Sequence, residues 1–427
     1  MTADNFWVGI DWADQTHQVC CLDHQGKIVW EQQVAHQQND IKQLMQRLRE
    51  LKGPVSIAIE TAHGLLIEEI LVAGLTVYAI NPKQAHTWCQ SLSVNAAKSD
   101  PADAYALGEG LRLFHPHLKP LAPEDPLTRE LRLLCRDEVT LIQERTALLN
   151  RWQATLKEYY PLVLEWFSEA NSPSAWDFVL EFPTPQAANQ AKRGKLTGFF
   201  KKHHIGLSPL WLKRIDQIKT SSSWQADPAT ERAKSLLAVS LSKQLRTLEA
   251  NLKSYREQIG WLFAQLPDKD IFTSLPGAGP KIGPRLAAEL GQDRNRFPDD
   301  MSLLCHAGVV PLTKASGKYR VVKIRYGCNK HLRDTVYHWS FLTLEYSIWS
   351  RAFYDMVRQG GQDHATALRN LGRKWMKILR RMWQDHSIYD EKKYLLSLEK
   401  HGSHLVKFIK PVQVDEQMQD STIAARV

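Results

Sequence analysis

The segment FWVGIDWADQTHQVCCLDHQGKIVWEQQV, at residues 6–34, decides the fold of the first part of the chain. It contains three short apolar runs, and the turn HQGK separates the second run from the third. Short apolar runs rich in Val and Ile and bounded by turn residues are typical of β-strands. The segment therefore predicts three consecutive strands, the first of which ends at Asp11.

The residues after this segment alternate between helical and strand patterns. Apolar residues at helical spacing predict a helix over residues 39–51, and PVSIAIE predicts a strand that ends on Glu60. A helix over LLIEEILVAG, a strand over TVYAI and a turn over NPK follow. Strand–helix–strand alternation after three strands predicts a mixed α/β sheet covered by helices. We place this α/β domain at residues 1–122.

The pattern then changes to long helices. Two charged, helical runs at residues 125–167 and 229–266 enclose shorter helices and loops, and they predict an antiparallel or an intermolecular coiled coil. We place this helical region at residues 123–268. A mostly α-helical C-terminal domain follows at 269–398, and a loose polar tail at 399–427.

Charge is distributed unevenly along the 427 residues, which carry a formal net charge of +9. Residues 1–120 hold 9 Lys and Arg against 13 Asp and Glu, so the positive excess lies in the remainder. Acidic residues can hold a metal ion, and basic residues can hold a polyanion such as nucleic acid. Because many basic surfaces bind nothing specific, charge alone leaves this interpretation open.

The sequence gives no sign of secretion or of a membrane. The N-terminus has no basic and apolar signal-peptide regions, and no apolar run approaches the ~18 residues of a membrane span. The six cysteines form no CxxC pair, which argues against a zinc site or a disulfide framework. We therefore expect a cytoplasmic protein.

Four acidic residues stand out in the predicted α/β domain. Asp11 and Glu60 end strands, where α/β folds place their sites, and Asp100 and Asp103 lie three residues apart in KSDPADAYAL. If Pro101 begins a helix, Asp100 is its N-cap and Asp103 faces roughly the same way. Together the four carboxylates predict an oxygen-rich cage for Mg²⁺ or Mn²⁺. Singly, each acid could equally end a strand at solvent or stabilise a helix terminus.

The stretch SLPGAGPKIGPRLAAEL, at residues 274–290, has the form of a helix-hairpin-helix. Its turn, with Gly277 and Gly279, lets backbone N–H groups approach a phosphate, and Lys281 adds positive charge. The alternative is a glycine-rich turn between two packed helices. A basic helix with interleaved aromatic residues at 366–383 is either a phosphate-tracking face or a solvated amphipathic helix.

The stretch PLTKASGKYRVVKIRYGCNK, at residues 311–330, contains one serine, Ser316, followed by glycine and several basic residues. By itself this pattern indicates a charged turn on a solvated surface. A serine hydroxyl is a weak nucleophile unless another group activates it. The segment alone therefore leaves open whether Ser316 is a turn residue or a nucleophile aimed at a phosphate.

Several motifs in sequence order resemble those of the DEDD insertion-sequence transposases: GIDWAD, IAIETAHG, KSDPADAYAL, LPGAGPKIGPRLAAELG, RFPDDMSLLCHAGVVP and SGK. These are bridge-RNA-guided serine recombinases, and a pilin-gene invertase is among their relatives. The resemblance covers about residues 1–395, and Lys98 also fits the family wording. It implies an RNase H-like, RuvC-like first domain. The catalytic metal ligands that it implies are Asp11, Glu60, Asp100 and Asp103.

The same resemblance implies a second, transposase domain in which Ser316 attacks a DNA phosphate and forms a covalent phosphoserine link. It implies a site-specific recombinase that excises and inserts its own element. The implied partners are Mg²⁺ or Mn²⁺, target and donor DNA, a structured guide RNA, and further copies of the chain in a dimer or tetramer. The residues that we expect to contact nucleic acid are Gly277, Gly279, Lys281, Lys318, Arg320, Lys323, Arg325, Lys330 and Arg333.

Other functions remain open at this point. A metal-dependent RuvC-like junction nuclease would cut without a covalent intermediate, a DNA invertase would reverse a segment, and a non-catalytic nucleic-acid-binding regulator would do neither. The sequence also departs from the family signature of Gly followed by Asn, because Cys328 stands between Gly327 and Asn329. This departure leaves the roles of Asn329 and Arg333 open, and we interpret Cys328 as a packing residue.

Overall fold

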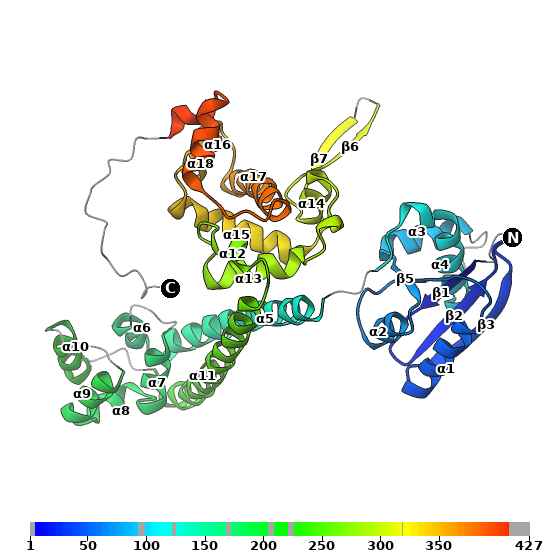
Figure 1. Cartoon of the computed structure of the whole chain (residues 1–427). Coiled ribbons are helices and arrows are strands. Elements are labelled where there is room, and N and C mark those ends of the chain that lie inside the picture. Colours follow the sequence, from blue (N-terminus) through cyan, green and yellow to red (C-terminus); the bar gives the residue numbers. More distant parts are fainter. Residues whose placement is uncertain are drawn as a thin grey trace. The chain divides into compact units, whose positions relative to one another are not determined.

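The computed structural model describes residues 5–92, 99–121, 125–167, 172–203, 209–220, 226–317 and 319–409. The chain divides into two compact units, residues 1–124 and residues 125–427 (Figure 1). The second unit contains both the helical region and the C-terminal domain that the sequence predicts. Their subdivision near residue 268 stays a prediction.

The first unit is built on a five-stranded sheet with the strand order β3-β2-β1-β4-β5. β2 is antiparallel to both β1 and β3, whereas β4 is parallel to both β1 and β5. This mixed sheet confirms the α/β class that the opening segment predicts. The strands are β1 (Phe6–Asp11), β2 (Thr16–Leu22), β3 (Ile28–Ala35), β4 (Val55–Ile59) and β5 (Thr76–Ala79).

Helices cover both faces of this sheet, and each face has its own apolar core. Val8 and Ile10 of β1 pack with α1 and α2, whereas Trp7 packs with α3 and α4. Successive side chains of a strand point to opposite faces, which is why neighbours in β1 belong to different cores. The helices are α1 (Gln38–Arg49), α2 (Leu65–Val72), α3 (Pro82–Leu92) and α4 (Asp100–Phe114).

The predicted turn over NPK is the beginning of α3. Asn81 precedes the helix, and its side-chain oxygen accepts a hydrogen bond from the backbone N–H of Lys83 at 2.9 Å. Proline suits a first helical position because the N–H that it lacks would have no partner there. Pro82 therefore begins a helix, and the prediction of a turn alone was wrong.

Two long helices of the second unit form an antiparallel pair, α5 (Pro126–Tyr159) and α11 (Pro228–Ala264). Polar contacts join them at successive levels, and each contact lies seven residues from the next in both helices. This is the spacing of a coiled coil, formed here within one chain. The contacts are Glu138 with Arg256, Arg145 with Glu249, and Trp152 with Ser242.

Short helices connect α5 to α11 (Figure 1). Their side chains pack an aromatic core against the two long helices. Trp152 and Tyr159 of α5 and Leu241 of α11 belong to this core, together with Phe178 and Phe200. The short helices are α6 (Leu162–Trp166), α7 (Pro173–Glu181), α8 (Pro185–Gln190), α9 (Arg193–Lys202) and α10 (Pro209–Thr220).

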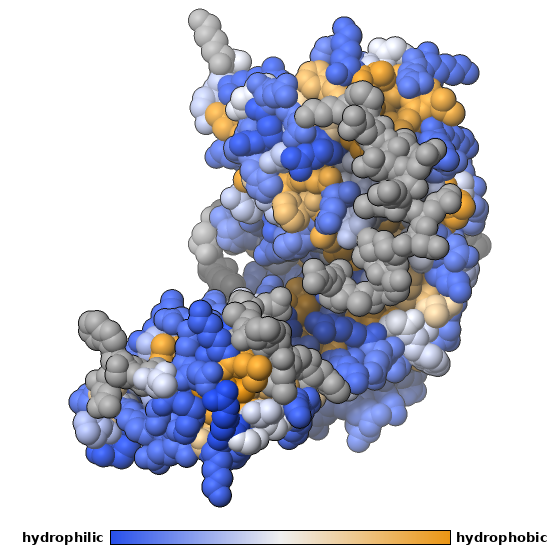
Figure 2. Space-filling model, turned by 90° about the vertical axis from the view of Figure 1, so that its left-hand side faces the viewer, coloured by the Kyte–Doolittle hydropathy of each residue, from blue (hydrophilic) through white to orange (hydrophobic). Residues whose placement is uncertain are grey.

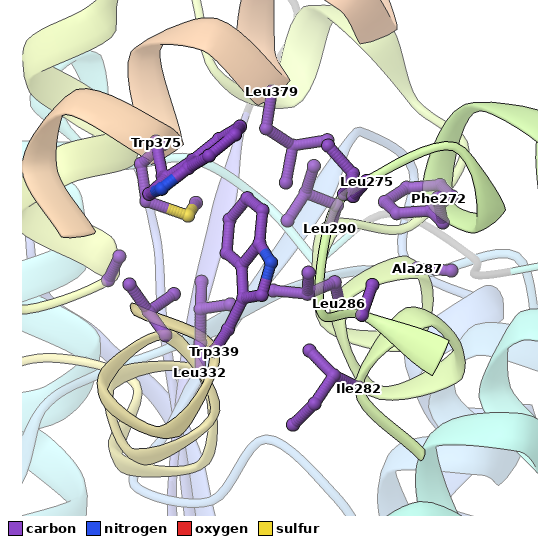
Figure 3. Close-up of a cluster of buried hydrophobic side chains, with 14 of the residues drawn as sticks. Phe272, Leu275, Ile282, Leu286, Ala287, Leu290, Leu332, Trp339, Trp375 and Leu379 are labelled. Atoms are coloured by element: carbon purple, nitrogen blue, oxygen red, sulfur yellow. The ribbon is translucent and has the colours of Figure 1, made fainter. Parts of the chain in front are cut away.

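The C-terminal helices form another core with the opposite ends of α5 and α11. Trp339 and Trp375 contact each other in this core, with ring centroids 5.0 Å apart (Figure 3). The helix predicted over residues 366–383 is confirmed as part of α17, which buries Leu368, Leu371, Trp375 and Leu379 on one face. The helices are α12 (Lys269–Thr273), α13 (Gly279–Leu290), α14 (Asp300–His306), α15 (Lys330–Tyr346), α16 (Ile348–Gln359), α17 (His364–Gln384) and α18 (Glu391–Lys400).

A two-stranded antiparallel hairpin, β6 (Leu312–Ser316) and β7 (Tyr319–Lys323), projects from the helices of the second unit (Figure 1). The sequence predicts a turn here but not the two strands. Nearly all of the described hairpin residues are exposed, so no buried face imposes an apolar alternation on the sequence.

The predicted loose tail is in part folded. A short 3-10 helix at His404–Phe408 packs against α16 and buries Leu405, so a loose tail from residue 399 was wrong over this stretch. The tail beyond residue 409 lies outside the described residues.

Hydrophilic residues cover most of the face seen in Figure 2, and hydrophobic residues gather there in separate patches. Within the described part of the chain, we find no helix that is long and apolar enough to cross a membrane.

Candidate functional site

Asp11 and Glu60 lie at the same edge of the sheet. Asp11 is the last residue of β1, and Glu60 directly follows β4. Ile10 lies opposite Ile59 in this parallel pair, so the next residue of each strand reaches the same level. Asp11 is half-buried and Glu60 is exposed. This edge holds the carboxyl ends of parallel strands, where α/β folds place their sites.

Helix α4 packs directly on β1. A Cβ atom at Gly9 would lie 1.9 Å from the carbonyl oxygen of Ala104, so only glycine allows this approach. One helical turn later, Gly108 lies against Trp7, which comes earlier in β1 than Gly9. The helix therefore runs antiparallel to β1, and its first turn lies toward the carboxyl end of that strand.

The first turn of α4 carries Asp100 and Asp103, but its N-cap is Ser99. The Ser99 hydroxyl accepts a hydrogen bond from the backbone N–H of Ala102 at 3.4 Å, so Asp100 is the first helical residue. The prediction of Asp100 as N-cap was therefore wrong by one position. Because serine caps the helix, capping does not occupy the Asp100 carboxylate. Lys98 lies outside the described residues.

Cys89 of α3 links two of the four acids. Burial, a hydrogen bond with Asp103 and the negative charges of Asp103 and Glu60 raise the pKa of this thiol to about 12. The two carboxylates come from α4 and from the end of β4, yet both lie close enough to act on the same group. The edge of the sheet is therefore a region of concentrated negative charge.

The donor chemistry of the four acids fits a hard divalent cation, because Mg²⁺ and Mn²⁺ prefer carboxylate oxygens. The side chains are not closed around a common point, however. Across the described ranges, no three Asp, Glu, His or Cys side chains are grouped closely enough to hold one ion. The ends of β1 and β4 and the first turn of α4 thus lie toward the same edge of the unit, without a closed set of ligands among the described residues.

Ser316 is the last residue of β6 and is exposed near the tip of the hairpin. It pairs across the hairpin with Tyr319, and Gly317 follows it in the turn. The φ angle of Gly317 is +55°, a conformation that residues with a Cβ atom rarely adopt, which explains the glycine after the serine. Lys318 itself lies outside the described residues.

Three of the predicted nucleic-acid contacts are accessible near this hairpin. Arg320 and Lys323 are exposed on β7, and Lys330 is exposed as the first residue of α15. Exposed cations on one projecting element can follow a phosphate backbone without a buried pocket. Arg320 and Lys323 therefore lie on the same hairpin as Ser316, whereas Lys330 is exposed at the start of α15.

Two other predicted contacts are partly engaged within the protein. Arg325 is half-buried, and its Nε donates a hydrogen bond to the carbonyl oxygen of Val310 at 3.4 Å. Arg333 is half-buried, and its Nε lies 3.1 Å from a carboxylate oxygen of Asp334. Arg325 therefore ties the segment after β7 to the segment before β6, whereas Arg333 pairs within α15.

The basic face of α17 is also partly neutralised. Arg380 pairs with Asp300 at 3.0 Å, and Lys377 lies 3.8 Å from the same carboxylate. Arg381 pairs with Asp385 one turn later in the helix. These acidic neighbours favour the alternative of a solvated amphipathic helix over a phosphate-tracking face.

The glycine-rich turn before α13 packs inward on one side. A Cβ atom at Gly277 would lie 3.1 Å from the backbone of Leu342, and Trp339 Nε1 donates to a carbonyl oxygen of the turn at 3.0 Å. Gly279 and Lys281 are exposed, and Gly279 has open space around it. The turn is therefore anchored on α15, while its other side is accessible.

The two predicted nucleic-acid elements lie at opposite ends of α13 and α15. Gly277 packs by Leu342 in the last turns of α15, whereas Glu289 near the end of α13 contacts Asn329, the N-cap of α15. The two helices are therefore antiparallel. About 15 Å of α13 separates the glycine-rich turn from the base of the hairpin.

A polar cluster at the base of the hairpin was not predicted. Buried Glu289 accepts hydrogen bonds from Arg136 at 2.8 and 2.9 Å and from Asn329 at 2.6 Å. Burial alone would raise the pKa of Glu289, but these bonds lower it below its usual value. His306 lies 3.3 Å from Asn329, and its burial lowers its pKa to about 4. The cluster joins α5, α13, α14 and α15.

Asn329 and Cys328 have structural roles at this junction. The side-chain oxygen of Asn329 accepts a hydrogen bond from the backbone N–H of Leu332 at 3.0 Å and so caps α15. The Cys328 sulfur packs on Gly308, where a Cβ atom would lie only 2.7 Å from it. The interpretation of Cys328 as a packing residue fits this contact. The capping role of Asn329 could have been inferred from an Asn before a helical run.

The acids at one sheet edge of the α/β unit, together with the exposed serine of the basic helical unit, fit a protein that processes nucleic acid. Comparison with known proteins identifies the family. A DEDD transposase family of the IS110 type matches residues 8–161, and the transposase IS116/IS110/IS902 family matches residues 269–355. The first match contains Asp11, Glu60, Asp100 and Asp103, and the second contains Ser316.

Relatives match most of the chain. A mini-circle protein of Streptomyces coelicolor, described as a candidate transposase for IS117, is 30% identical over 395 residues, which are 90% of this chain and 95% of that protein. The 43.6 kDa protein of insertion element IS110 from the same species is 25% identical over 394 residues, 90% of this chain and 96% of that protein. The 42 kDa protein of IS900 from Mycobacterium paratuberculosis is 23% identical over 399 residues, with 91% and 98% coverage.

The chain belongs to the IS116/IS110/IS902 family of transposases. It is therefore an enzyme, a DNA transposase, and DNA is its substrate. The DEDD domain also suggests an RNase H-like fold for the first unit and dependence on a divalent metal ion.

Proposed function

We propose that this transposase cleaves and rejoins DNA through a covalent phosphoserine intermediate on Ser316. The observation that carries the proposal is that this serine is exposed at the end of β6, directly before Gly317, in a hairpin that projects from the helices (Figure 1) and carries exposed cations. A nucleophile that must reach a phosphate in DNA needs such access, because the DNA backbone cannot enter a narrow pocket. Gly317 keeps the approach next to the hydroxyl free of a side chain.

The proposed step conserves the phosphodiester. The Ser316 oxygen forms a bond to phosphorus and loses its proton, while the bond from phosphorus to one DNA oxygen breaks and that oxygen gains a proton. The energy of the broken ester is kept in the serine ester, so a hydroxyl of another DNA end can reverse the step and rejoin the strands. Neither an oxidant nor a nucleotide cofactor is needed.

We further propose that Asp11, Glu60, Asp100 and Asp103 hold Mg²⁺ or Mn²⁺ at the edge of the sheet. Their convergence on one edge and the negative charge around Cys89 support this assignment. A bound divalent ion supplies positive charge to phosphate oxygens and helps a hydroxyl to lose its proton. The protein's own part is to hold the carboxylates on rigid strand and helix ends.

A structured guide RNA and further copies of the chain are proposed partners. The family resemblance of the motifs supports the RNA, and the net charge of +9 agrees with a second polyanion. The antiparallel pair of α5 and α11 offers a long surface for contacts between copies in a dimer or tetramer.

A trapped protein–DNA adduct tests the proposal. The full chain, purified with any RNA that it retains, is incubated with DNA carrying the boundary of its element, and the adduct is mapped by mass spectrometry. We expect an adduct on Ser316 that is lost in Ser316→Ala and kept in Thr313→Ala, a matched exposed position on β6. We expect Asp11→Ala to lose cleavage as well.

Cleavage without any adduct, unchanged in Ser316→Ala but lost in Asp11→Ala, would instead identify a metal-dependent nuclease of the RuvC type. Membership of a transposase family already disfavours a non-catalytic regulator.

A further inference from the structure

The hairpin that carries Ser316 has two faces with different chemistry. Residues directly opposite each other in an antiparallel pair share a face, and so do residues two apart in one strand. The register pairs Ser316 with Tyr319, Lys314 with Val321, and Leu312 with Lys323, so these six residues form one face, the serine face. The opposite face holds Thr313, Ala315, Arg320 and Val322.

The residue nearest to Ser316 across the hairpin is therefore an aromatic one. Residues directly opposite in such a pair have Cβ atoms about 5 Å apart, so the side chains of Tyr319 and Ser316 leave the backbone as neighbours on the same face. Tyr319 is 62% exposed, although burying a ring of this size would be favourable. An exposed aromatic ring next to a group that reaches DNA is a ready surface for a nucleotide base.

The remaining residues of the serine face suit the same ligand. Lys314 and Lys323 are exposed on it, one in each strand and both nearer the base of the hairpin than Ser316, and they can contact phosphates on one side of the attacked position. Arg320, in contrast, points to the opposite face, so it cannot contact the same phosphate as Ser316 from within the hairpin. The register thus places Lys323 and Arg320, two of the predicted nucleic-acid contacts, on opposite faces of the hairpin.

We propose that Tyr319 is a positioning residue that stacks on the nucleotide next to the phosphate attacked by Ser316. Base–aromatic stacking contributes about 1–3 kcal/mol per base and does not depend on base identity, because every base has a π-face. The stacked base fixes the neighbouring phosphate against the serine oxygen. The inference rests on the proposed role of Ser316 and assigns Tyr319 no covalent chemistry.

Three variants of the full chain test this inference on a DNA fragment with the element boundary. Tyr319→Ala should lower the rate of adduct formation by about 5- to 100-fold, the loss that corresponds to one stacked base. Tyr319→Phe keeps the ring and should stay within about twofold of the unchanged protein. Val322→Ala is the matched control, because Val322 is 60% exposed in the same strand but lies on the opposite face.

A DNA fragment that lacks the base next to the attacked phosphate distinguishes stacking from support of the hairpin. If Tyr319 acts on that base, the unchanged protein and Tyr319→Ala should react equally slowly with this fragment. A difference that persists without the base would overturn the inference, as would equal rates of Tyr319→Ala and Val322→Ala on intact DNA. An adduct mapped to the Tyr319 oxygen would also overturn it.

The outcome for Ser316 is read separately. If Ser316→Ala still forms the adduct, the proposed function fails; if it abolishes the adduct while Tyr319→Ala reacts normally, only the present inference fails. Affinity for the same DNA is a readout that needs no chemistry. Tyr319→Ala should bind more weakly than Tyr319→Phe, and equal affinities would contradict stacking.

Discussion

At the scale of single residues, Gly9 decides how closely the acids of α4 approach those of the sheet. Its missing side chain lets the backbone of α4 lie on the backbone of β1, with Ala104 and Gly108 as the facing positions. Backbone atoms cannot move aside as a flexible side chain would. The position of Asp100 and Asp103 is therefore tied to the sheet that ends in Asp11.

We predict that Gly9→Ala destabilises the first unit by more than about 2 kcal/mol, because the added methyl overlaps a backbone carbonyl. Hydrogen exchange followed by mass spectrometry over β1 and α4 locates the effect, and chemical denaturation gives its size. Gly198→Ala is the control, since that helical glycine has open space around it and the change should be neutral or stabilising by up to about 1 kcal/mol. Equal effects of the two changes would contradict the close contact.

The sequence predicts single residues well where a local pattern determines them. Asp11 and Glu60 stand at strand ends because the apolar runs stop there, so their positions could be predicted from the sequence. The N-cap of α4 was missed by one residue, because serine and aspartate are nearly equal as caps. Tyr319 and Ser316 are neighbours because their strands pair across a turn. Apolar periodicity does not predict this pairing, because the hairpin is exposed and has no buried face.

At the scale of elements, Glu138 joins three helices of the second unit. Its buried carboxylate on α5 pairs with Arg256 of α11 at 3.3 Å and with Arg285 of α13 at 2.7 Å. The side chain of Glu138 is only 3% exposed and that of Arg285 is 15% exposed. Arg256 also pairs with Glu249 at 3.4 Å, so Arg285 is the arginine that loses a buried partner when Glu138 is removed. The long helical pair is attached to the C-terminal helices at this point.

We predict that Glu138→Ala lowers the free energy of unfolding of the second unit by about 3–5 kcal/mol, the cost of leaving a buried charge unpaired. Glu257→Ala is a control on the same helical pair, because Glu257 and its partner Lys253 are 68% and 78% exposed. That change should cost less than about 1 kcal/mol. Denaturant titration of the three proteins measures both values, and a similar cost for the two variants would refute the prediction.

The elements themselves were predictable to different degrees. The long helices α5 and α11 can be predicted from their apolar spacing. The same spacing does not predict whether they pair within one chain or between two chains. Their antiparallel contact is fixed by polar pairs more than a hundred residues apart, such as Arg145 with Glu249. The cluster around Glu289 was invisible for the same reason, because it collects single residues from four separate helices.

At the scale of the whole molecule, the chain is two units with cores of their own. The acid edge belongs entirely to the first unit and Ser316 entirely to the second. An active site that needs both can therefore be completed within one copy or between two copies of the chain. The proposed oligomer favours completion between copies.

We predict that a mixture of full-length Asp11→Ala and Ser316→Ala proteins forms the adduct that neither forms alone. In a mixed assembly, intact acids of one copy can serve the intact serine of another. Differently tagged proteins show that mixed assemblies are present, and the adduct is measured across a range of ratios. Verified mixed assemblies with no adduct at any ratio would place the complete site within one copy.

The seven-residue register of α5 and α11 also determines how such a protein can change in length. Each level of contact lies seven residues from the next in both helices. Adding seven residues to each helix at matching positions would lengthen the pair by about 10 Å and keep every partner face aligned. Adding three or four to one helix alone would turn its remaining contacts away from the partner. Insertions and deletions in this region should therefore occur in sevens and in both helices together.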